Sequence, residues 1–176
     1  MPLTGLLKID GIEGESNVAN HDDEIDVFDV MWEITRPNSA ARGAGRARGR
    51  AIAGDFRFRK LTDSSSPYLA LACSRGQTFD EITFTASRVD GTAPFDYFVI
   101  TLSECIVSGF HIDGVEDLTQ DQIKETVSIA AQSIKILYTI PSRGAGANEE
   151  HEVEFDLSAS SQSVRPAVAV PGFVRG

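Results

Sequence analysis

Eight basic side chains are concentrated in one part of this 176-residue sequence, and they are its strongest candidates for binding chemistry. The run from Arg36 to Lys60 contains these eight, half of the chain's 16 Lys and Arg, and one acid, Asp55. The run carries +7 and the whole chain −10 at pH 7, so the remainder carries −17. Arginine forms paired hydrogen bonds with phosphates and carboxylates. The segment therefore predicts a basic arm that contacts something acidic through Arg42, Arg46, Arg48 and Arg50.

Two kinds of partner fit such an arm, beside the plainer interpretation that its charge only keeps a loop soluble. A nucleic acid would be held by its phosphates. However, residues 35–54 contain no aromatic side chain to stack on bases, and the acidic remainder of the chain repels a phosphate backbone. An acidic surface on a second copy fits the charge asymmetry better. A contact between two different surfaces of one chain repeats head to tail, so it builds stacks.

The glycine and serine motifs do not indicate an enzyme. Gly43 and Gly45 begin a dinucleotide-like motif, but the next glycine, Gly49, comes one residue late and no helix pattern follows. The sequence contains no Gly-x-Ser-x-Gly elbow, so a hydrolase triad has no nucleophile. We therefore expect no catalytic residues and no cofactor.

Two acidic clusters are candidates for metal binding or acid–base chemistry. The first is His21-Asp22-Asp23-Glu24, but the other two histidines lie at no ligand spacing to it. The second is an alternating row that lacks the glycine and spacing of a calcium loop, formed by Glu150, Glu152, Glu154 and Asp156. Both clusters are more typical of a solvated loop and a solvated strand face, so we expect no metal site.

Alternating apolar residues predict a protein made mainly of antiparallel β-strands. We expect strands over 6–10, 26–34, 55–61, 78–86, 95–102, 104–112, 127–140 and 150–157, with a bulge near Ala130. One helix is predicted over 67–75, with Ser66 as its N-cap and Gly76 at its end. The pattern indicates an antiparallel β-barrel or two packed sheets, with 35–54 as a long extended hairpin loop. We assign 1–157 to this domain and 158–176 to a flexible C-terminal tail.

The expected strands differ in how many apolar faces they have. Residues 26–34 have one, formed by Phe28, Val30, Trp32 and Ile34. Residues 95–102 have two, with Phe95, Tyr97 and Val99 on one and Phe98, Ile100 and Leu102 on the other. In an antiparallel protein, a strand that is apolar on both faces indicates cover from a neighbouring subunit. We therefore predict an inter-subunit contact at Phe95, Tyr97, Phe98 and Ile100.

The composition is that of a globular domain, with 41% hydrophobic and 24% charged residues. The sequence contains neither an apolar run long enough to span a bilayer nor the pattern of a signal peptide. We expect synthesis and folding in the cytoplasm, with export only through a dedicated machine. Cys73 and Cys105 are expected to be two buried free thiols.

Several motifs, in order, resemble those of the hemolysin-coregulated protein (Hcp) family, the tube component of bacterial type VI secretion systems. They span residues 6 to about 157 and comprise Lys8-Ile9-Asp10-Gly11-Ile12-x-Gly14-Glu15-Ser16, His21, Glu24-Ile25-Asp26-Val27, Trp32, Asp55-Phe56-x-Phe58-x-Lys60, Ser66-Pro67 before the Leu69–Cys73 helix, Ile100-Thr101-Leu102, Glu125-Thr126-Val127-Ser128-Ile129 and Phe155-Asp156-Leu157. Phe155 stands where the family usually has tryptophan, and the arginine-rich insert and the tail also depart from the family pattern.

The resemblance implies a β-barrel with one helix that assembles into homohexameric rings. Rings stack head to tail into a tube that a contracting sheath propels out of the cell behind a spike protein, and small effectors travel in the lumen. The extended hairpin would contact the neighbouring ring. The implied function is thus structural, with no direct membrane insertion and no nucleic acid. A phage-tail-tube-like protein and a nucleic-acid-binding β-barrel that uses the arginine-rich loop are the alternatives.

Overall fold

The predicted antiparallel barrel with one short helix is confirmed in the computed structural model, which describes residues 3–36, 51–90, 93–114, 123–141, 148–157 and 165–166. The elements are β1 Leu3–Ile9, β2 Ile25–Met31, β3 Ile34–Thr35, β4 Ile52–Ala53, β5 Phe56–Leu61, α1 Ser66–Arg75, β6 Thr78–Asp90, β7 Ala93–Gly114, β8 Lys124–Ala130, β9 Ser133–Ile140, β10 Glu149–Asp156 and β11 Arg165–Pro166.

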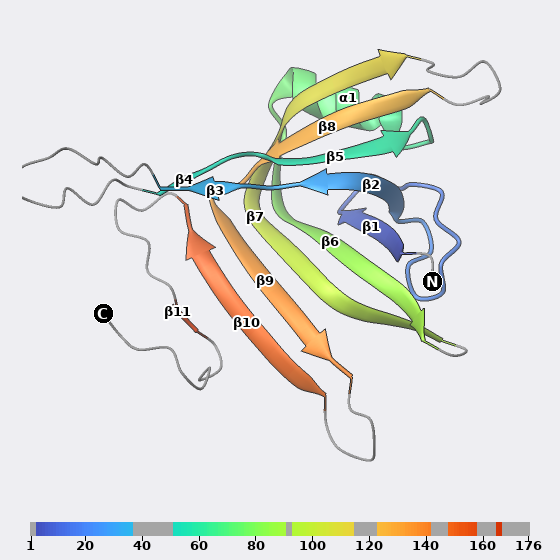
Figure 1. The fold of residues 1–176 in the computed structure, drawn as a ribbon. Helices are drawn as coiled ribbons and strands as arrows, with labels where there is room; N and C mark the ends of the chain where they lie inside the picture. Colours follow the sequence, from blue (N-terminus) through green and yellow to red (C-terminus); the bar gives the residue numbers. More distant parts are fainter. Residues whose placement is uncertain are drawn as a thin grey trace, which may run out of the picture.

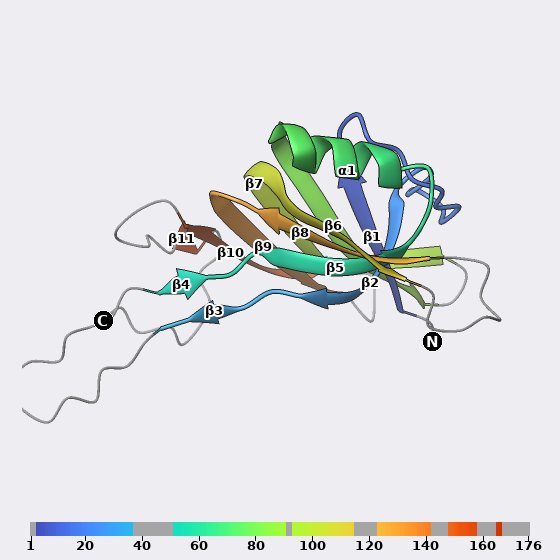
Figure 2. The same cartoon turned by 90° about the horizontal axis from the view of Figure 1, so that it is seen from above.

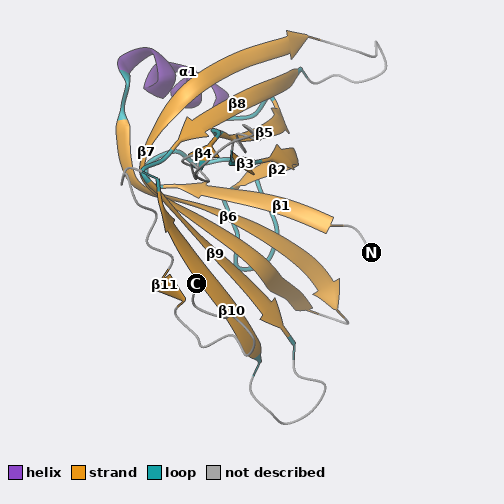
Figure 3. Ribbon diagram, turned by 60° about the vertical axis from the view of Figure 1, so that its left-hand side comes forward, coloured by secondary structure: helices purple, strands orange, loops and turns teal. Residues whose placement is uncertain are grey.

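Six antiparallel strands close the barrel in the order β7-β6-β1-β2-β5-β8, because β8 pairs both with β5 and with β7 (Figures 1 and 2). Strands β9, β10 and β11 continue the sheet outward from β7 and take no part in the closure (Figure 3). The main sheet therefore has two regions: a closed barrel, and an extension attached to β7.

The long strand β7 belongs to both regions. Its residues 98–103 pair with β9, and its residues 106–114 pair with β8. Glu104 lies between the two parts with a positive φ of 51°, which marks a local bend. The separate strands expected over 95–102 and 104–112 are thus one strand. The slip near Ala130 is not a bulge within a strand but the crossing from β8 to β9.

The core confirms the expected alternation in several strands. Ile82, Phe84 and Ala86 of β6 are all at most 6% exposed, and they join Phe56 and Phe58 of β5 in one cluster. The rings of Phe56 and Phe84 lie 5.6 Å apart. Burying an aromatic or large aliphatic side chain of this kind stabilises the fold by about 1.5–3 kcal/mol.

The inward face predicted for the second strand is right for Val30 and Trp32, which pack against the core, and wrong for Phe28 and Ile34. Val27 is in the core at 5% exposed, whereas Phe28 is 36% and Ile34 39% exposed. Asp29 has a positive φ of 49°, and the pairing with β5 shifts between Phe28 and Met31. A shift of one residue moves side chains to the other face of a sheet. A bulge of this kind leaves no trace in an apolar pattern.

Helix α1 lies against β7 and begins one residue earlier than expected, with Ser65 at the N-cap and Pro67 in the first turn. Gly76 ends the helix as predicted, with a φ of 62° that suits glycine at this position. Leu69 and Ala72 face the barrel and are buried, while Tyr68 is 59% exposed.

Candidate assembly surfaces

The base of the basic arm is a separate two-stranded sheet that leaves the barrel at one end (Figure 2). Ile34 of β3 pairs with Ala53 of β4, and Thr35 pairs with Ile52. The amide of Gly54 donates to the carbonyl of Glu33 at 3.0 Å. The four arginines predicted as inter-ring contacts, Arg42, Arg46, Arg48 and Arg50, lie outside the described residues. Their role therefore stays a prediction.

Trp32, which precedes the arm, contacts the end of β10. The rings of Trp32 and Phe155 have centroids 6.1 Å apart in a tilted arrangement. The amide of Leu157 donates to the carbonyl of Gln132 at 2.8 Å. A hollow of about 350 Å³ separates residues 51–55 from 130–131 and Leu157.

An aromatic patch lies where β6, β7 and β9 run side by side, at the end away from the arm (Figure 1). The rings of Tyr97 and Tyr138 meet edge to face at 6.4 Å. The guanidinium of Arg88 lies 5.8 Å from the ring of Phe95 and 5.3 Å from that of Tyr97. We use the term aromatic patch for five residues: Arg88, Phe95, Tyr97, Phe98 and Tyr138.

The patch corrects the two-face interpretation of residues 95–102. Ala86 pairs with Phe98 but Ser87 pairs with Asp96, so Tyr97 is an extra residue in β7. This bulge places Phe95 on the same face as Phe98, and the ring contacts bring Tyr97 to that face too. The aromatic residues therefore form one surface and not two.

The four predicted inter-subunit residues differ in exposure. Ile100 is 5% exposed and belongs to the core of its own barrel. Phe95, Tyr97 and Phe98 are half-buried. Tyr138, which the sequence analysis did not single out, completes their surface and is 44% exposed. The alternation of β9 contained a signal for it, since Tyr138 follows Ile134 and Ile136.

An acidic row on β10 lies on the other face of the same sheet extension. His151 pairs with Tyr138, and Val153 pairs with Ile136, so these residues share the face of the aromatic patch. The alternate residues point to the opposite face, and they are Glu150, Glu152 and Glu154. The Nζ of Lys135 lies 4.0 Å from a carboxylate oxygen of Glu152. We use the term acidic row for these three glutamates.

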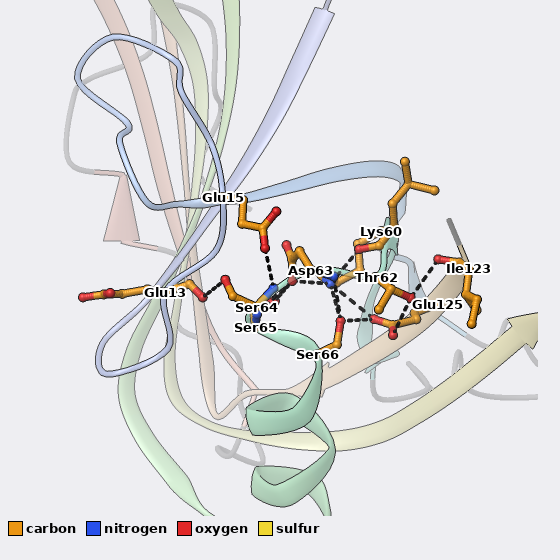
Figure 4. A network of polar contacts seen from close by, with 11 residues as sticks. Glu13, Glu15, Lys60, Thr62, Asp63, Ser64, Ser65, Ser66, Ile123 and Glu125 are labelled. Carbon is orange, nitrogen blue, oxygen red and sulfur yellow. Dashed lines mark hydrogen bonds and ion pairs between the residues drawn. The ribbon is translucent and has the colours of Figure 1, made fainter. Parts of the chain in front are cut away.

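A buried lysine joins the strands of the barrel to the start of helix α1 (Figure 4). Lys60 is 0% exposed. Its Nζ lies 2.7 Å from Asp63 Oδ1, 2.9 Å from Ser66 Oγ, 3.2 Å from Glu125 Oε2 and 2.8 Å from the carbonyl of Leu61. The hydroxyl of Ser66 donates to Glu125 at 2.7 Å. Every donor of this ammonium group is therefore satisfied. We call Lys60, Asp63, Ser66 and Glu125 the lysine cluster.

The lysine cluster corrects the role expected for Ser66. Ser66 does not cap the helix; its hydroxyl lies between Lys60 and Glu125 and also accepts from the amide of Asp63 at 3.1 Å. Next to it, Ser64 donates its amide to Glu15 at 3.0 Å, which holds the loop after β1. The sequence contained a signal for this cluster, because Lys60 continues the inward alternation of Phe56 and Phe58.

The acidic neighbours of His21 predicted a solvated loop, but the structure shows that His21 is buried, at 8% exposed. Its Nδ1 lies 3.0 Å from Glu24 Oε2, and its Nε2 lies 3.1 Å from Asp96 Oδ1 of β7. Burial by itself lowers the pKa of His21, but hydrogen bonding to, and the charges of, Glu24 and Asp96 outweigh burial and raise it above 6.5. His21 thus ties the loop before β2 to the start of β7.

The described residues contain no group of three or more His, Cys, Asp or Glu placed to hold a metal ion. Both cysteines are free thiols, as expected. Cys105 is fully buried, and this burial raises its pKa to about 12, while Cys73 is only half-buried. Within the described part of the chain, the helix is too short to cross a bilayer.

Comparison with known proteins gives one consistent family. A sequence model described as "Type VI secretion system effector, Hcp" matches residues 6–138. Protein hcp1 of Pseudomonas aeruginosa is 29% identical over 155 residues, which cover 88% of this chain and 94% of that protein.

Solved structures share the fold. A type six secretion system protein superposes with a TM-score of 0.81 at 22% identity, covering 92% of this chain and all of that one. Hcp1 from Salmonella typhimurium superposes with a TM-score of 0.73 at 24% identity, covering 93% of this chain and all of that one. Because the family match spans most of the chain, this protein belongs to the Hcp family of the type VI secretion system, whose members are structural secreted tube proteins and not enzymes.

Proposed function

We propose that this protein forms homohexameric rings that stack head to tail into the secreted tube of a type VI secretion system. The observation that carries the proposal is the sheet extension outside the barrel, with its aromatic patch. Tyr138 and Ile140 on β9 are 44% and 39% exposed, beside the half-buried Phe95, Tyr97 and Phe98. The extension of β9, β10 and β11 is attached to the barrel only along β7, and clustered tyrosine and arginine are typical of interface hot spots. A neighbouring subunit is the cover that this patch requires.

Charge supports the stacking of rings. The arm carries Arg42, Arg46, Arg48 and Arg50, while the chain as a whole carries −10. The arm is basic and the rest of the chain is acidic, so the arm is attracted electrostatically to the acidic part of another copy. The arm contacts the neighbouring ring in this proposal, and the aromatic patch makes the contact within the ring.

Native mass spectrometry at micromolar concentration tests the ring. The expected species has six times the 19.0 kDa mass of the chain. A wild-type protein that remains a monomer at this concentration would contradict the proposal. Electron microscopy of the same sample shows whether the rings stack by themselves.

The same proposal includes the route and the cargo. The protein resides in the bacterial cytoplasm before firing, assembles with the spike protein inside the sheath, and leaves the cell with small effectors in the lumen. The expected result is that the protein reaches the culture supernatant in cells with a working sheath and stays in the cell pellet when the sheath protein is deleted. Equal release from both strains would contradict this route.

A further inference from the structure

We infer that Arg88 is the anchor of the contact between neighbouring subunits, and that it binds carboxylates of the acidic row on strand β10 of the next copy. This inference rests on the proposed ring and adds to it the chemistry of the partner surface. Arg88 is the cationic member of the aromatic patch, and Glu150 and Glu154 are the exposed members of the acidic row.

Arg88 is held in place by its own subunit but is not satisfied by it. The Cζ of its guanidinium lies over the rings of Phe95 and Tyr97, 5.8 and 5.3 Å from their centroids. Its Nε is buried and has no hydrogen-bond partner among the described residues. A stacked guanidinium still presents its edge, and that edge matches a carboxylate with two parallel hydrogen bonds. Because Nε is buried, an acid from another copy would bind the part of the guanidinium that the half-buried side chain leaves exposed.

The acidic row offers carboxylates that its own subunit leaves exposed. Glu150 and Glu154 are exposed, and neither forms an ion pair with a residue whose side chain the structure describes, although Arg165 of β11 lies opposite Glu154 in the strand register. Lys135 approaches only Glu152, at 4.0 Å. A chain with a net charge of −10 gains from neutralising such a row at a contact between two copies.

The register places the two surfaces on opposite faces of one continuous sheet. Arg88 pairs with Phe95, and the β7 bulge puts this pair on the face of Phe98, which pairs with Tyr138. Glu150 and Glu154 point away from that face, because His151 shares it with Tyr138. Arg88 and the acidic row therefore cannot meet within one subunit. Two different surfaces that complement each other form a head-to-tail contact, which closes into a ring when the rotation allows.

The test is a double-mutant cycle on ring assembly, read by mass photometry over a dilution series. We expect Arg88→Gln to raise the concentration at half-assembly about tenfold or more, and Glu150→Gln/Glu154→Gln to do the same. Arg88→Lys should rescue little, since an ammonium group makes no paired contact with a carboxylate. The combined triple variant should assemble no worse than Arg88→Gln alone, because the three residues act in one contact.

Matched controls are Arg75→Gln on the exposed end of α1 and Asp80→Asn on β6, which should leave assembly unchanged. Thermal unfolding shows that each variant is folded, and the glutamate variants keep the test valid if Arg88→Gln unfolds. Rings of wild-type stability in Arg88→Gln would overturn the inference, as would fully additive losses or a loss in Arg88→Gln without one in Glu150→Gln/Glu154→Gln. A wild-type protein that forms no ring would instead overturn the proposed function.

Discussion

The lysine cluster and the aromatic patch each contain one cation, and the two cations differ in whether their own subunit supplies their hydrogen-bond partners. Lys60 is 0% exposed and its ammonium contacts two carboxylates, a hydroxyl and a carbonyl within 3.2 Å. Arg88 lies against two aromatic rings, and its buried Nε has no hydrogen-bond partner in the described chain. The first cation is complete within one subunit, and the second is not.

This difference separates folding from assembly. A buried charge is retained only when paired, so the partners of Lys60 have to be present in the folded monomer. Arg88 as a whole is half-buried, so part of its side chain is open to an acid from another copy. The lysine cluster should therefore set the stability of each subunit, and the aromatic patch should set the stability of the ring.

The largest expected effect is on folding. Glu125→Gln leaves the buried ammonium of Lys60 with one carboxylate partner, Asp63, instead of two, so we expect a loss of about 1.5–3 kcal/mol in the free energy of unfolding. Urea denaturation of the monomer, monitored by circular dichroism, measures this loss. Lys60→Met/Glu125→Leu should lose less than either single change, because it removes both charges together. Lys8→Met, at an exposed position on β1, is the control. A loss below 1 kcal/mol in Glu125→Gln would show that the cluster does not hold the fold.

The second effect is on the ring alone. We expect Tyr138→Ala to weaken each subunit contact by about 2 kcal/mol, because it removes a half-exposed aromatic from the patch. Its free energy of unfolding should change by about 1 kcal/mol or less. Native mass spectrometry over a dilution series measures the first quantity and urea denaturation the second. Tyr68→Ala removes a tyrosine that is 59% exposed on α1 and serves as the matched control. If both tyrosine variants assemble alike, the patch is not the ring contact.

A third effect is on stacking. Changing Arg42, Arg46, Arg48 and Arg50 to alanine should leave rings intact and shorten the stacks, because the arm loses the charge that attracts it to the acidic body of the next ring. Electron microscopy at low and at 0.5 M salt measures stack length, and salt should shorten wild-type stacks in the same way.

Two outcomes of the arm experiment would contradict its role between rings. Dissolution into monomers would show that the arm acts within the ring. Salt-sensitive binding of a random oligonucleotide, lost in the same variant, would favour the nucleic-acid-binding interpretation of the four arginines.

The sequence predicted the barrel, the helix over 67–75 and the inward face of β6 because each depends on local alternation or local termination. It misplaced one end of each apolar face in β2 and β7, because a single extra residue at Asp29 or Tyr97 reverses the alternation on one side of the bulge. In the lysine cluster, Glu125 contacts Ser66 and Lys60, which lie 59 and 65 positions before it in the chain. Arg88 contacts Phe95 across a hairpin. Such contacts depend on register, which an apolar pattern does not contain.

The smallest expected effect is the pH dependence of the His21 contact. Because Glu24 and Asp96 raise the pKa of His21 in the folded state, its protonated form stabilises the fold fully below about pH 6.5. That contribution is lost as the pH rises through the raised pKa. We therefore expect wild-type protein to exceed His21→Gln in free energy of unfolding at pH 6, and the difference to shrink toward pH 8. His111→Gln, with a side chain that is 75% exposed, should show no such trend. A difference that stays constant from pH 6 to pH 8 would mean that the charge of His21 does not hold its loop to β7.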